Sequence, residues 1–513
     1  MEFILFFFPI VIIGALLLGR INENAAYAFI FVSSLYFYST FEESNVQLIL
    51  ILIVASFGIG RAMELCDSKR LRYCLMWLGV GLNIGALGFY KYYSFIAKEF
   101  DLFESTEPEY LVIDLPLAIS FLAFQQISYL VDVGIRRLPV HGFLRYGMVV
   151  SFFPHLIAGP ILRYSEISPQ LDRKVKWYKH PVNLSVGVSL IAVGFAKKVL
   201  LADHFAVYVE PAFSAADAGL ALTFMEAWTA ALSYTFQIYF DFSAYSDMAA
   251  GLAFCLGIRF PVNFLSPYKA SSIISFWRRW HVSLSRFLRD YLYVPIGGGR
   301  RGQMRKFGNI FITMLIGGIW HGAGWNFLIW GAGHGLALIG NHAYRGACKH
   351  WNWVPAAPRW LGWIITFTTI TILWVVFRAN DMASATLILK GMAGLNGIVL
   401  PDTYSHYLGL TVNFLPWVQF EQVRPGVLTY YHGVLQVAEI FAALGFVMFL
   451  PNTFEIFRGV NPFLIEPRAR LLGRKNKVIR WKPSFLIFGL LLITYFYTLF
   501  FAAEPAEFLY FQF

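Results

Sequence analysis

The sequence predicts an all-α protein that crosses a membrane several times. Of its 513 residues, 58% are hydrophobic and 14% are charged, whereas an average soluble domain carries roughly 25% charged residues. Apolar segments recur from Phe3 to Phe501, and no long polar stretch separates them. Because about 20 apolar residues in a helix span the hydrocarbon layer, we expect about 11 transmembrane helices. We expect residues 1–513 to form one membrane-embedded domain.

The positive charge is best explained by membrane topology. The net charge is +11, but the Lys and Arg residues cluster in short loops beside apolar segments, as the positive-inside bias requires. We therefore expect contact with membrane lipids and no nucleic-acid partner. The four cysteines, Cys66, Cys74, Cys255 and Cys348, show no metal-ligand spacing and predict neither a metal site nor a disulfide framework.

The N-terminal third predicts a series of spans with an external N-terminus. The first apolar run lacks a basic leader, so we expect a retained helix. The loop at 61–73 is basic and should lie inside, whereas the loop at 99–109 is acidic and should lie outside. The expected spans are Phe3–Leu18, Ala26–Tyr38, Val46–Ile59, Cys74–Phe89 and Leu111–Val133.

A proline-broken segment follows at Ser151–Leu171. Pro154 and Pro160 leave apolar stretches too short to span, which predicts a re-entrant element. Val182–Leu201 and Leu222–Tyr245 are the next expected spans, and the second carries Asp241. That carboxylate either lines a polar cavity or is paired with a nearby Arg.

The stretch Ser272–Tyr293 predicts an interfacial amphipathic helix. Its aromatic and leucine residues recur at helical spacing, and Arg278, His281 and Ser285 share one stripe. A basic loop at 458–482 should face the cytoplasm, and the C-terminal tail should emerge outside. The remaining expected spans are Phe307–Trp320, Trp325–Gly340, Leu361–Phe377, Val434–Leu450 and Phe485–Phe501.

His321 is the first candidate for chemistry. It lies in the apolar segment GGIWHGAGWNF. Moving an imidazole from water into such a segment costs free energy, so a histidine found there indicates function. A neutral histidine can take a proton from a hydroxyl as that oxygen attacks an acyl carbon, which favours acyl transfer from a thioester. The alternative is a histidine that only hydrogen-bonds a carbonyl where the helix breaks. His281 is the second candidate, with a plain interfacial histidine as its alternative.

The run YLYVPIGGGRRG is a candidate phosphate site. Gly298 offers backbone N–H groups, and Arg300 and Arg301 offer guanidinium groups that bind phosphates. A flexible basic turn is an equally good explanation. We place Arg278, Trp280 and Ser285 on the same donor side. The candidates for lining a polar cavity are His155, Asp241, Trp320, Asn326 and His334, with a structural role as the alternative for the two histidines.

Several motifs together give the chain a family resemblance. They are NIGALGFYKY, FFPHLIAGPILR, FDFSAYSDMAAGLA, NFLSPY, FWRRWHVSLSRFLRDYLYVPIGG, GGIWHGAGWNFLIWGAGHG and ILWVVFRAN. With these motifs the sequence resembles the membrane-bound O-acyltransferase family, and within it the bacterial branch that acetylates alginate and related exopolysaccharides. The resemblance implies a ring of tilted helices with re-entrant segments around a central tunnel, which the five cavity candidates would line, and a catalytic core at 150–345. It also implies that His321 is the catalytic histidine and His281 the second polar position.

The resemblance further implies an O-acetyltransferase of the bacterial inner membrane, with both termini periplasmic. Acetyl coenzyme A, or another phosphopantetheine thioester, would be a cytoplasmic co-substrate, and no cofactor would be bound permanently. A periplasmic SGNH-like acetyltransferase, or the polysaccharide itself, would be the acceptor. Three alternatives stay open: an acyl carrier protein as donor, a non-enzymatic transporter or scaffold, and transfer of a long acyl chain to a lipid or protein.

Overall fold

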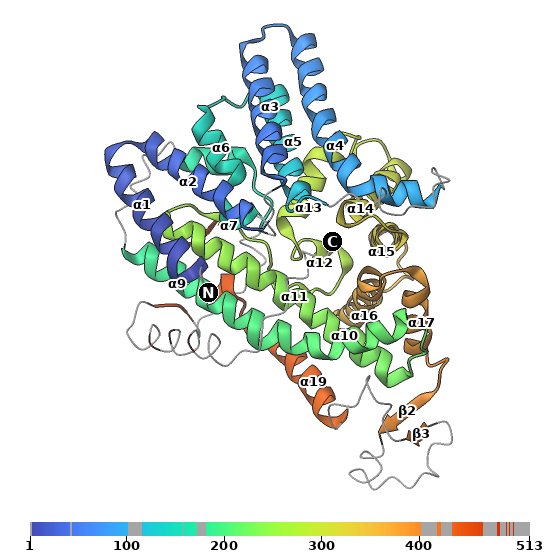
Figure 1. Cartoon of the computed structure of the whole chain (residues 1–513). Coiled ribbons are helices and arrows are strands. Elements are labelled where there is room, and N and C mark those ends of the chain that lie inside the picture. The colour runs from blue at the N-terminus through green and yellow to red at the C-terminus, as the bar shows by residue number, and fades with distance from the viewer. Residues whose placement is uncertain are drawn as a thin grey trace.

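The computed structural model confirms an all-α architecture, in which long helices cross one another and the few strands are short (Figure 1). Two pairs of strands are present in the described part, β1 with β4 and β2 with β3, and both pairs are parallel. The structure describes residues 3–41, 44–100, 115–156, 159–171, 181–401, 418–421, 433–464 and 480–482, and the isolated positions 489, 492 and 496.

The N-terminal half consists of helices of very different length. Its elements are η1 (Phe3–Phe7), α1 (Phe8–Ile21), α2 (Glu23–Ser39), α3 (Val46–Leu65), α4 (Lys69–Glu99), α5 (Ile119–Arg136), α6 (Phe143–Ser151), α7 (Phe153–Leu156), α8 (Tyr164–Leu171), α9 (Pro181–Lys197), η3 (Lys198–Ala202), α10 (Asp203–Asp217) and α11 (Phe224–Cys255).

The C-terminal half begins with a short strand and several short helices. Its elements are β1 (Phe260–Pro261), η4 (Pro267–Lys269), α12 (Ile273–Trp277), α13 (Val282–Leu288), η5 (Arg289–Tyr293), α14 (Gln303–His321), α15 (Trp325–His350), α16 (Arg359–Arg378), α17 (Met382–Met392), β2 (Ile398–Pro401), β3 (Val418–Glu421), α19 (Gly433–Phe449), α20 (Thr453–Phe457) and β4 (Phe463–Leu464).

Several of these helices can cross a membrane. Within the described residues, five helical stretches have the length and apolar composition for it: Val46–Leu65, Lys69–Glu99, Pro181–Asp217, Arg359–Arg378 and Leu435–Phe457. The protein is therefore a multi-pass membrane protein. The total of about 11 spans stays a prediction. The predicted span at 485–501, the C-terminal tail and most of the acidic loop at 99–109 lie outside the described residues, apart from isolated positions.

Helix α11 is the central element of the fold. It begins with a capping box: the Thr223 side chain accepts a hydrogen bond from the backbone N–H of Glu226, and the Glu226 carboxylate accepts one from the backbone N–H of Thr223. Nearly all side chains of α11 are buried. It packs closely on α9 because two glycines meet there: a Cβ atom at Gly187 would lie 2.7 Å from the carbonyl oxygen of Gly251. In Figure 1, α11 runs through the middle of the molecule and α9 lies alongside it, toward the lower left.

The prediction of one continuous helix over Ser272–Tyr293 is wrong. The chain forms α12, breaks, and resumes as α13 and η5. The break occurs at His281, whose φ of 40° is left-handed, a conformation that non-glycine residues rarely adopt. The backbone is held there by the segment after β1, since Val282 N–H donates to Asn263 O and Leu265 N–H donates to Arg279 O. Arg278 and His281 therefore do not share a helical stripe.

Candidate active site

His281 and His321 come together at the open end of a helical hairpin. One arm is α13 with η5, the other is α14, and Leu288 on the first arm packs against Gly317 on the second. The ring of Trp320 contacts both histidines, with its centroid 6.4 Å from that of His281 and 4.8 Å from that of His321. The fold therefore brings the two predicted catalytic residues to one place.

Aromatic side chains enclose His321. Its side chain is buried, and its ring centroid lies 5.0 Å from that of Trp330 on α15 and 5.2 Å from that of Phe377 on α16. Helix α14 ends at His321 because the chain becomes extended at Gly322, where a Cβ atom would collide with the ring of Phe327. This glycine thus permits the close packing that surrounds the imidazole.

Two side chains from α4 cap the helix that carries His321. Lys91 Nζ donates to the backbone oxygens of Trp320 and His321, at 2.8 Å in both cases, and Tyr92 Oη donates to Ile319 O at 2.6 Å. The last carbonyls of a helix have no partner within the helix, and a cation is favourable at that end. Lys91 therefore holds the end of α14 in position from a distant part of the sequence.

Lys91 is not among the predicted site residues, although the sequence carries a signal for this cap. Lys91 lies in the motif NIGALGFYKY, directly after the predicted span Cys74–Phe89. The helix continues to Glu99, so the ammonium group is buried in the protein rather than placed in a loop. A charged residue inside an apolar helix is a marker of function in membrane proteins.

His281 is held by a polar cluster on its other side. Its Nδ1 lies 3.1 Å from Asn263 Oδ1, and the same oxygen accepts hydrogen bonds from Ser283 Oγ at 2.9 Å and Ser283 N at 3.3 Å. The edge of its ring meets Phe242 on α11, with 4.7 Å between the centroids. Asn263 and Ser283 lie in the motifs NFLSPY and FWRRWHVSLSRF, but neither is among the predicted site residues.

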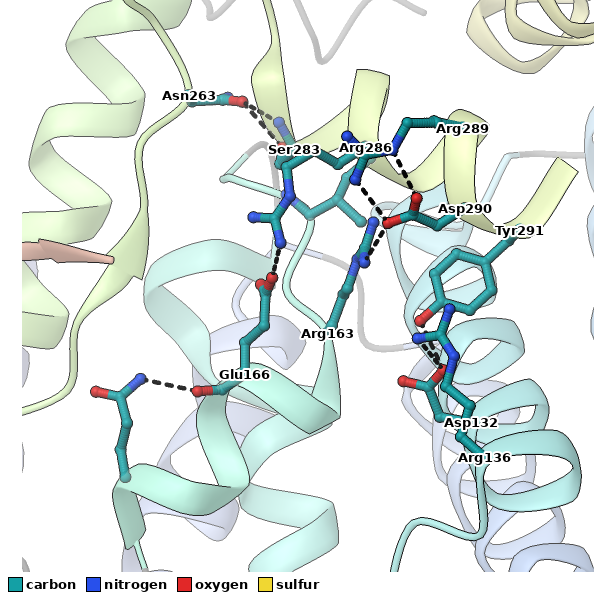
Figure 2. A network of polar contacts seen from close by, with 12 residues as sticks. Asp132, Arg136, Arg163, Glu166, Asn263, Ser283, Arg286, Arg289, Asp290 and Tyr291 are labelled. Carbon is teal, nitrogen blue, oxygen red and sulfur yellow. Dashed lines mark hydrogen bonds and ion pairs between the residues drawn. The ribbon is translucent and has the colours of Figure 1, made fainter. Parts of the chain in front are cut away.

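Ion pairs clamp the broken segment at 151–171 onto the hairpin (Figure 2). Arg163 Nη1 lies 2.8 Å from Asp290 Oδ2, and Glu166 pairs with Arg286. Ile161 N–H donates to Ser283 Oγ at 3.0 Å, which connects this segment to the cluster around His281. The predicted re-entrant segment is therefore fixed to the element that carries the candidate site.

Asp290 remains ionised at the centre of this clamp. Burial alone would raise the pKa of Asp290, but its hydrogen bonds with Arg289 and Arg163 outweigh burial and lower that pKa. Beside it, Tyr291 Oη donates to Asp132 Oδ1 at 2.9 Å, and Arg136 pairs with the same carboxylate at 2.8 Å. Figure 2 shows this contact, in which Asp132 and Arg136 on α5 meet Tyr291 on η5.

Two of the predicted tunnel residues, His334 and Asn326, lie on α15 and are buried. His334 is fully buried, its ring centroid lies 4.6 Å from that of Trp330, and its Nδ1 accepts a hydrogen bond from Trp277 Nε1 at 3.2 Å. Asn326 is buried at the start of the helix and donates to Ala379 O at 2.8 Å, which ties α15 to the end of α16. The indole ring of Trp330 therefore contacts both His334 and His321.

The other two polar tunnel candidates have partners elsewhere. His155 on α7 has its Nε2 3.1 Å from Gln125 Oε1 and packs against Phe260. Asp241 on α11 forms a buried ion pair with Lys198 at 2.8 Å, and Lys198 also pairs with Asp203. Of the two interpretations of Asp241, the geometry favours ion pairing, with a lysine in place of the expected arginine.

The predicted donor-side residues are spread over the hairpin. Arg300 and Arg301 are exposed at its closed end, and Gly298 has a φ of 55° in the turn just before them. Helix α14 separates that end from His321 by roughly 27 Å, at 1.5 Å per residue. Ser285 lies one turn after His281, to whose carbonyl its N–H donates, whereas Arg278 is exposed. Trp280 is buried in the core.

A cavity of about 130 Å³ borders the polar cluster around His281, because Asn263 is part of its lining. Its polar lining includes Asn263, Asp247, Lys197, Asn452 and Thr453. Lys197 and Asp247 form an ion pair in its wall, and Thr453 donates to Asp247. Within the described residues, no three His, Cys, Asp or Glu side chains are arranged to hold a metal ion.

Comparisons with known proteins show the family and the relatives to which the chain is similar. The model of the membrane-bound O-acyltransferase family matches residues 136–384, which include both histidines. A peptidoglycan O-acetyltransferase of Helicobacter pylori is 39% identical over 78% of this chain and 80% of its own length. A protein of Pseudomonas aeruginosa named probable alginate O-acetylase is 34% identical over 94% of this chain and 90% of its own length. A teichoic acid D-alanyltransferase of Bacillus subtilis is 27% identical over 52% of this chain and 69% of its own length.

Proposed function

The chain belongs to the membrane-bound O-acyltransferase family and is therefore an acyltransferase, and we propose that it transfers acetyl groups to hydroxyls of a polysaccharide outside the cytoplasm. The relatives named peptidoglycan O-acetyltransferase and probable alginate O-acetylase, at 39% and 34% identity, support acetyl as the acyl group and a polysaccharide as the final acceptor. Membership in an enzyme family also removes the alternative of a non-enzymatic transporter or scaffold.

The observation that carries the proposal is that His281 and His321 both contact the ring of Trp320. Both imidazoles are buried among aromatic rings. Water is excluded from such a site, so it does not compete with the acceptor hydroxyl for the acyl group. In the proposed reaction an imidazole takes the hydroxyl proton while the oxygen attacks the thioester carbon. The C–S bond then breaks, the acetyl group stays on the oxygen, and the thiolate leaves and takes up a proton. His321 acts as this base or activates the acceptor, and His281 supports it by hydrogen bonding or proton relay.

The donor is acetyl coenzyme A, approaching from the cytoplasm. The exposed Arg300 and Arg301 support this direction, because they lie in a basic stretch that the positive-inside bias assigns to the cytoplasmic face. Their distance from His321, roughly 27 Å at 1.5 Å per helical residue, is comparable to the hydrocarbon thickness of about 30 Å. A phosphate group held there needs a long flexible arm to bring its thioester to the histidines, as a phosphopantetheine thioester has. A central tunnel within a ring of tilted helices would provide the path.

The acceptor enters from the opposite side. We place the protein in the bacterial inner membrane with both termini in the periplasm, and a periplasmic SGNH-like acetyltransferase or the polysaccharide itself receives the acetyl group. A carrier-protein thioester is the second candidate for the donor, because the chain is similar over about half its length to a teichoic acid D-alanyltransferase.

The test uses protein purified in detergent, with a matched pair of variants. His321→Ala removes the proposed base, and His350→Ala removes an exposed histidine at the end of α15. Each protein receives acetyl coenzyme A or an acetylated carrier protein, together with polysaccharide fragments, and free thiol and acetylated product are measured. We expect His321→Ala to lose at least about a hundredfold in turnover, since general base catalysis contributes 10²–10⁴-fold.

His350→Ala should keep the activity of the wild-type protein. Full acetylation by His321→Ala at equal protein level would overturn the assignment of His321, and acetylation from the carrier thioester alone would replace the proposed donor. If His281→Ala lowers turnover by less than about tenfold, roughly 1.4 kcal/mol of barrier, His281 has only a structural role.

A further inference from the structure

We propose that Asn263 is a positioning residue for His281: its side-chain oxygen keeps a proton on Nδ1 of His281 and leaves the lone pair of the imidazole on Nε2. This inference rests on the proposed acetyl transfer, because it specifies which nitrogen of the second histidine takes part in moving the proton. Asn263 itself need not touch a substrate.

The first step is to identify which atom of the Asn263 amide faces His281. The backbone N–H of Ser283 can only donate a hydrogen bond, and it points to Oδ1 of Asn263 at 3.3 Å. On the opposite side of the amide, Nδ2 of Asn263 donates to Ser246 Oγ at 3.1 Å. The amide therefore has one consistent orientation, with its oxygen toward His281.

The hydroxyl of Ser283 confirms this orientation. Its oxygen accepts the N–H of Ile161 at 3.0 Å, and its own proton is directed to Asn263 Oδ1 at 2.9 Å. The alternative acceptor, His281 Nδ1, is farther from Ser283 Oγ, at 3.4 Å. The hydroxyl proton thus goes to the amide oxygen, and His281 Nδ1 does not need to accept it.

The tautomer of His281 follows from these contacts. Nδ1 of His281 lies 3.1 Å from an oxygen that can only accept, so Nδ1 carries a proton. A neutral imidazole has a single N–H, and its lone pair is then on Nε2. In histidines that act as bases, the hydrogen bond at one ring nitrogen commonly determines which nitrogen takes the proton.

The backbone of Asn263 holds the same histidine. Its carbonyl oxygen accepts the N–H of Val282 at 3.0 Å, directly after the left-handed residue His281. Strained backbone of this kind persists only where surrounding contacts determine it, and it is concentrated at functional sites. Asn263 is 3% exposed and His281 is 0% exposed, so these hydrogen bonds are made away from water.

Charged and titratable groups approach this cluster from several elements. His321 on α14 shares the neighbouring ring of Trp320 with His281, and Lys91 on α4 caps the helix end that carries His321. Lys197 and Asp247 form their ion pair across α9 and α11, near Ser246. Arg163 and Asp290 pair on the side of Ile161. Each of these charges has a partner at hydrogen-bonding distance, whereas a charge introduced at residue 263 would act directly on Nδ1 of His281.

The test replaces Asn263 by Asp and, separately, by Ala, in the full-length protein purified in detergent. Acetyl transfer from acetyl coenzyme A is measured from pH 5 to pH 9, with kcat and KM determined at each pH. Asn263→Asp keeps the accepting oxygen and adds a negative charge beside Nδ1, which favours the protonated imidazole. We expect its activity to fall off on the acid side at a pH about one unit higher than in the wild-type protein.

Asn263→Ala removes the acceptor and with it the preference for one tautomer. We expect kcat to fall by about 10- to 100-fold, within the contribution of general base catalysis, while KM for the thioester changes by less than about twofold. The control is Ser246→Ala, which removes the hydrogen bond on the far side of the amide and leaves Oδ1 in place. It should keep the wild-type pH profile.

Two results would overturn the inference. One is an unshifted acid limb in Asn263→Asp, and the other is an Asn263→Ala variant with the kcat of the wild-type protein. If Asn263→Asp and Asn263→Ala lose activity equally with an unshifted profile, the residue supports the fold and does not position the imidazole. In each of these cases a loss of activity in His321→Ala would still support the proposed function, so the two proposals can fail separately.

Discussion

Replacing Lys91 by Met tests how the end of α14 is held in place. The side chain of Lys91 crosses from α4 to α14 and donates to the carbonyls of Trp320 and His321, both at 2.8 Å. Met is similar in length and is apolar, so it fills much of the same space without donating a hydrogen bond. The substitution leaves two carbonyl groups at the helix end without these donors, right beside the candidate base.

The expected magnitude follows from the contacts. A hydrogen bond to a charged group contributes about 1.5–3 kcal/mol, so two of them contribute about 3–6 kcal/mol. Part of this loss is offset, because Met avoids the cost of several kcal/mol for burying an ammonium group. We expect a net loss of about 1–3 kcal/mol of stability. We also expect a 10- to 100-fold lower acetyl-transfer rate, which corresponds to about 1.4–2.7 kcal/mol of barrier.

The assay compares Lys91→Met with Lys98→Met, which removes an exposed lysine two turns later on the same helix. Turnover with acetyl coenzyme A and the midpoint of thermal unfolding in detergent are measured for both. Adding Lys91→Met to His321→Ala should cause no further loss of turnover if Lys91 acts through His321. Wild-type turnover and stability in Lys91→Met would refute the reasoning, as would losses equal to those of Lys98→Met.

Two further substitutions test the packing around the site. Asp290→Asn should lower thermal stability by about 1–2 kcal/mol, because Asp290 loses its charge-assisted bonds with Arg163 and Arg289. Because the pKa of Asp290 is lowered in the folded state, the difference in stability between the wild-type protein and Asp290→Asn should be complete at neutral pH and should disappear only as the pH falls through the pKa of the folded state. Equal unfolding midpoints at pH 7 would contradict this prediction. Gly331→Ala should cost about 1–3 kcal/mol of stability, since its Cβ would lie 2.6 Å from the carbonyl oxygen of Met314 where α15 packs on α14. Gly340→Ala on the same helix, with open space around its Cβ, should be neutral, and equal midpoints for the two variants would refute the packing argument.

Much of the overall fold is local in origin and was therefore predictable. Long apolar runs form helices in a membrane because each helix satisfies its own backbone hydrogen bonds. The expected spans at 46–59, 182–201 and 361–377 all lie within helices of the structure, although the helices extend beyond them. The break at His281 was not predictable from periodicity. The contacts that stabilise its left-handed backbone come from Asn263, which lies in a separate motif.

The sequence by itself determined that the protein is a helical multi-pass membrane protein of this family, and it singled out His321 and His281 as the candidate catalytic residues. Each of these depends on composition, on local spacing or on a short motif. Only the tertiary structure decided that the two imidazoles meet around Trp320, that Lys91 caps the helix of His321, and that Asn263 faces His281. The physical reason is that these contacts join residues far apart in the chain, through hydrogen bonds whose geometry exists only after the helices have packed.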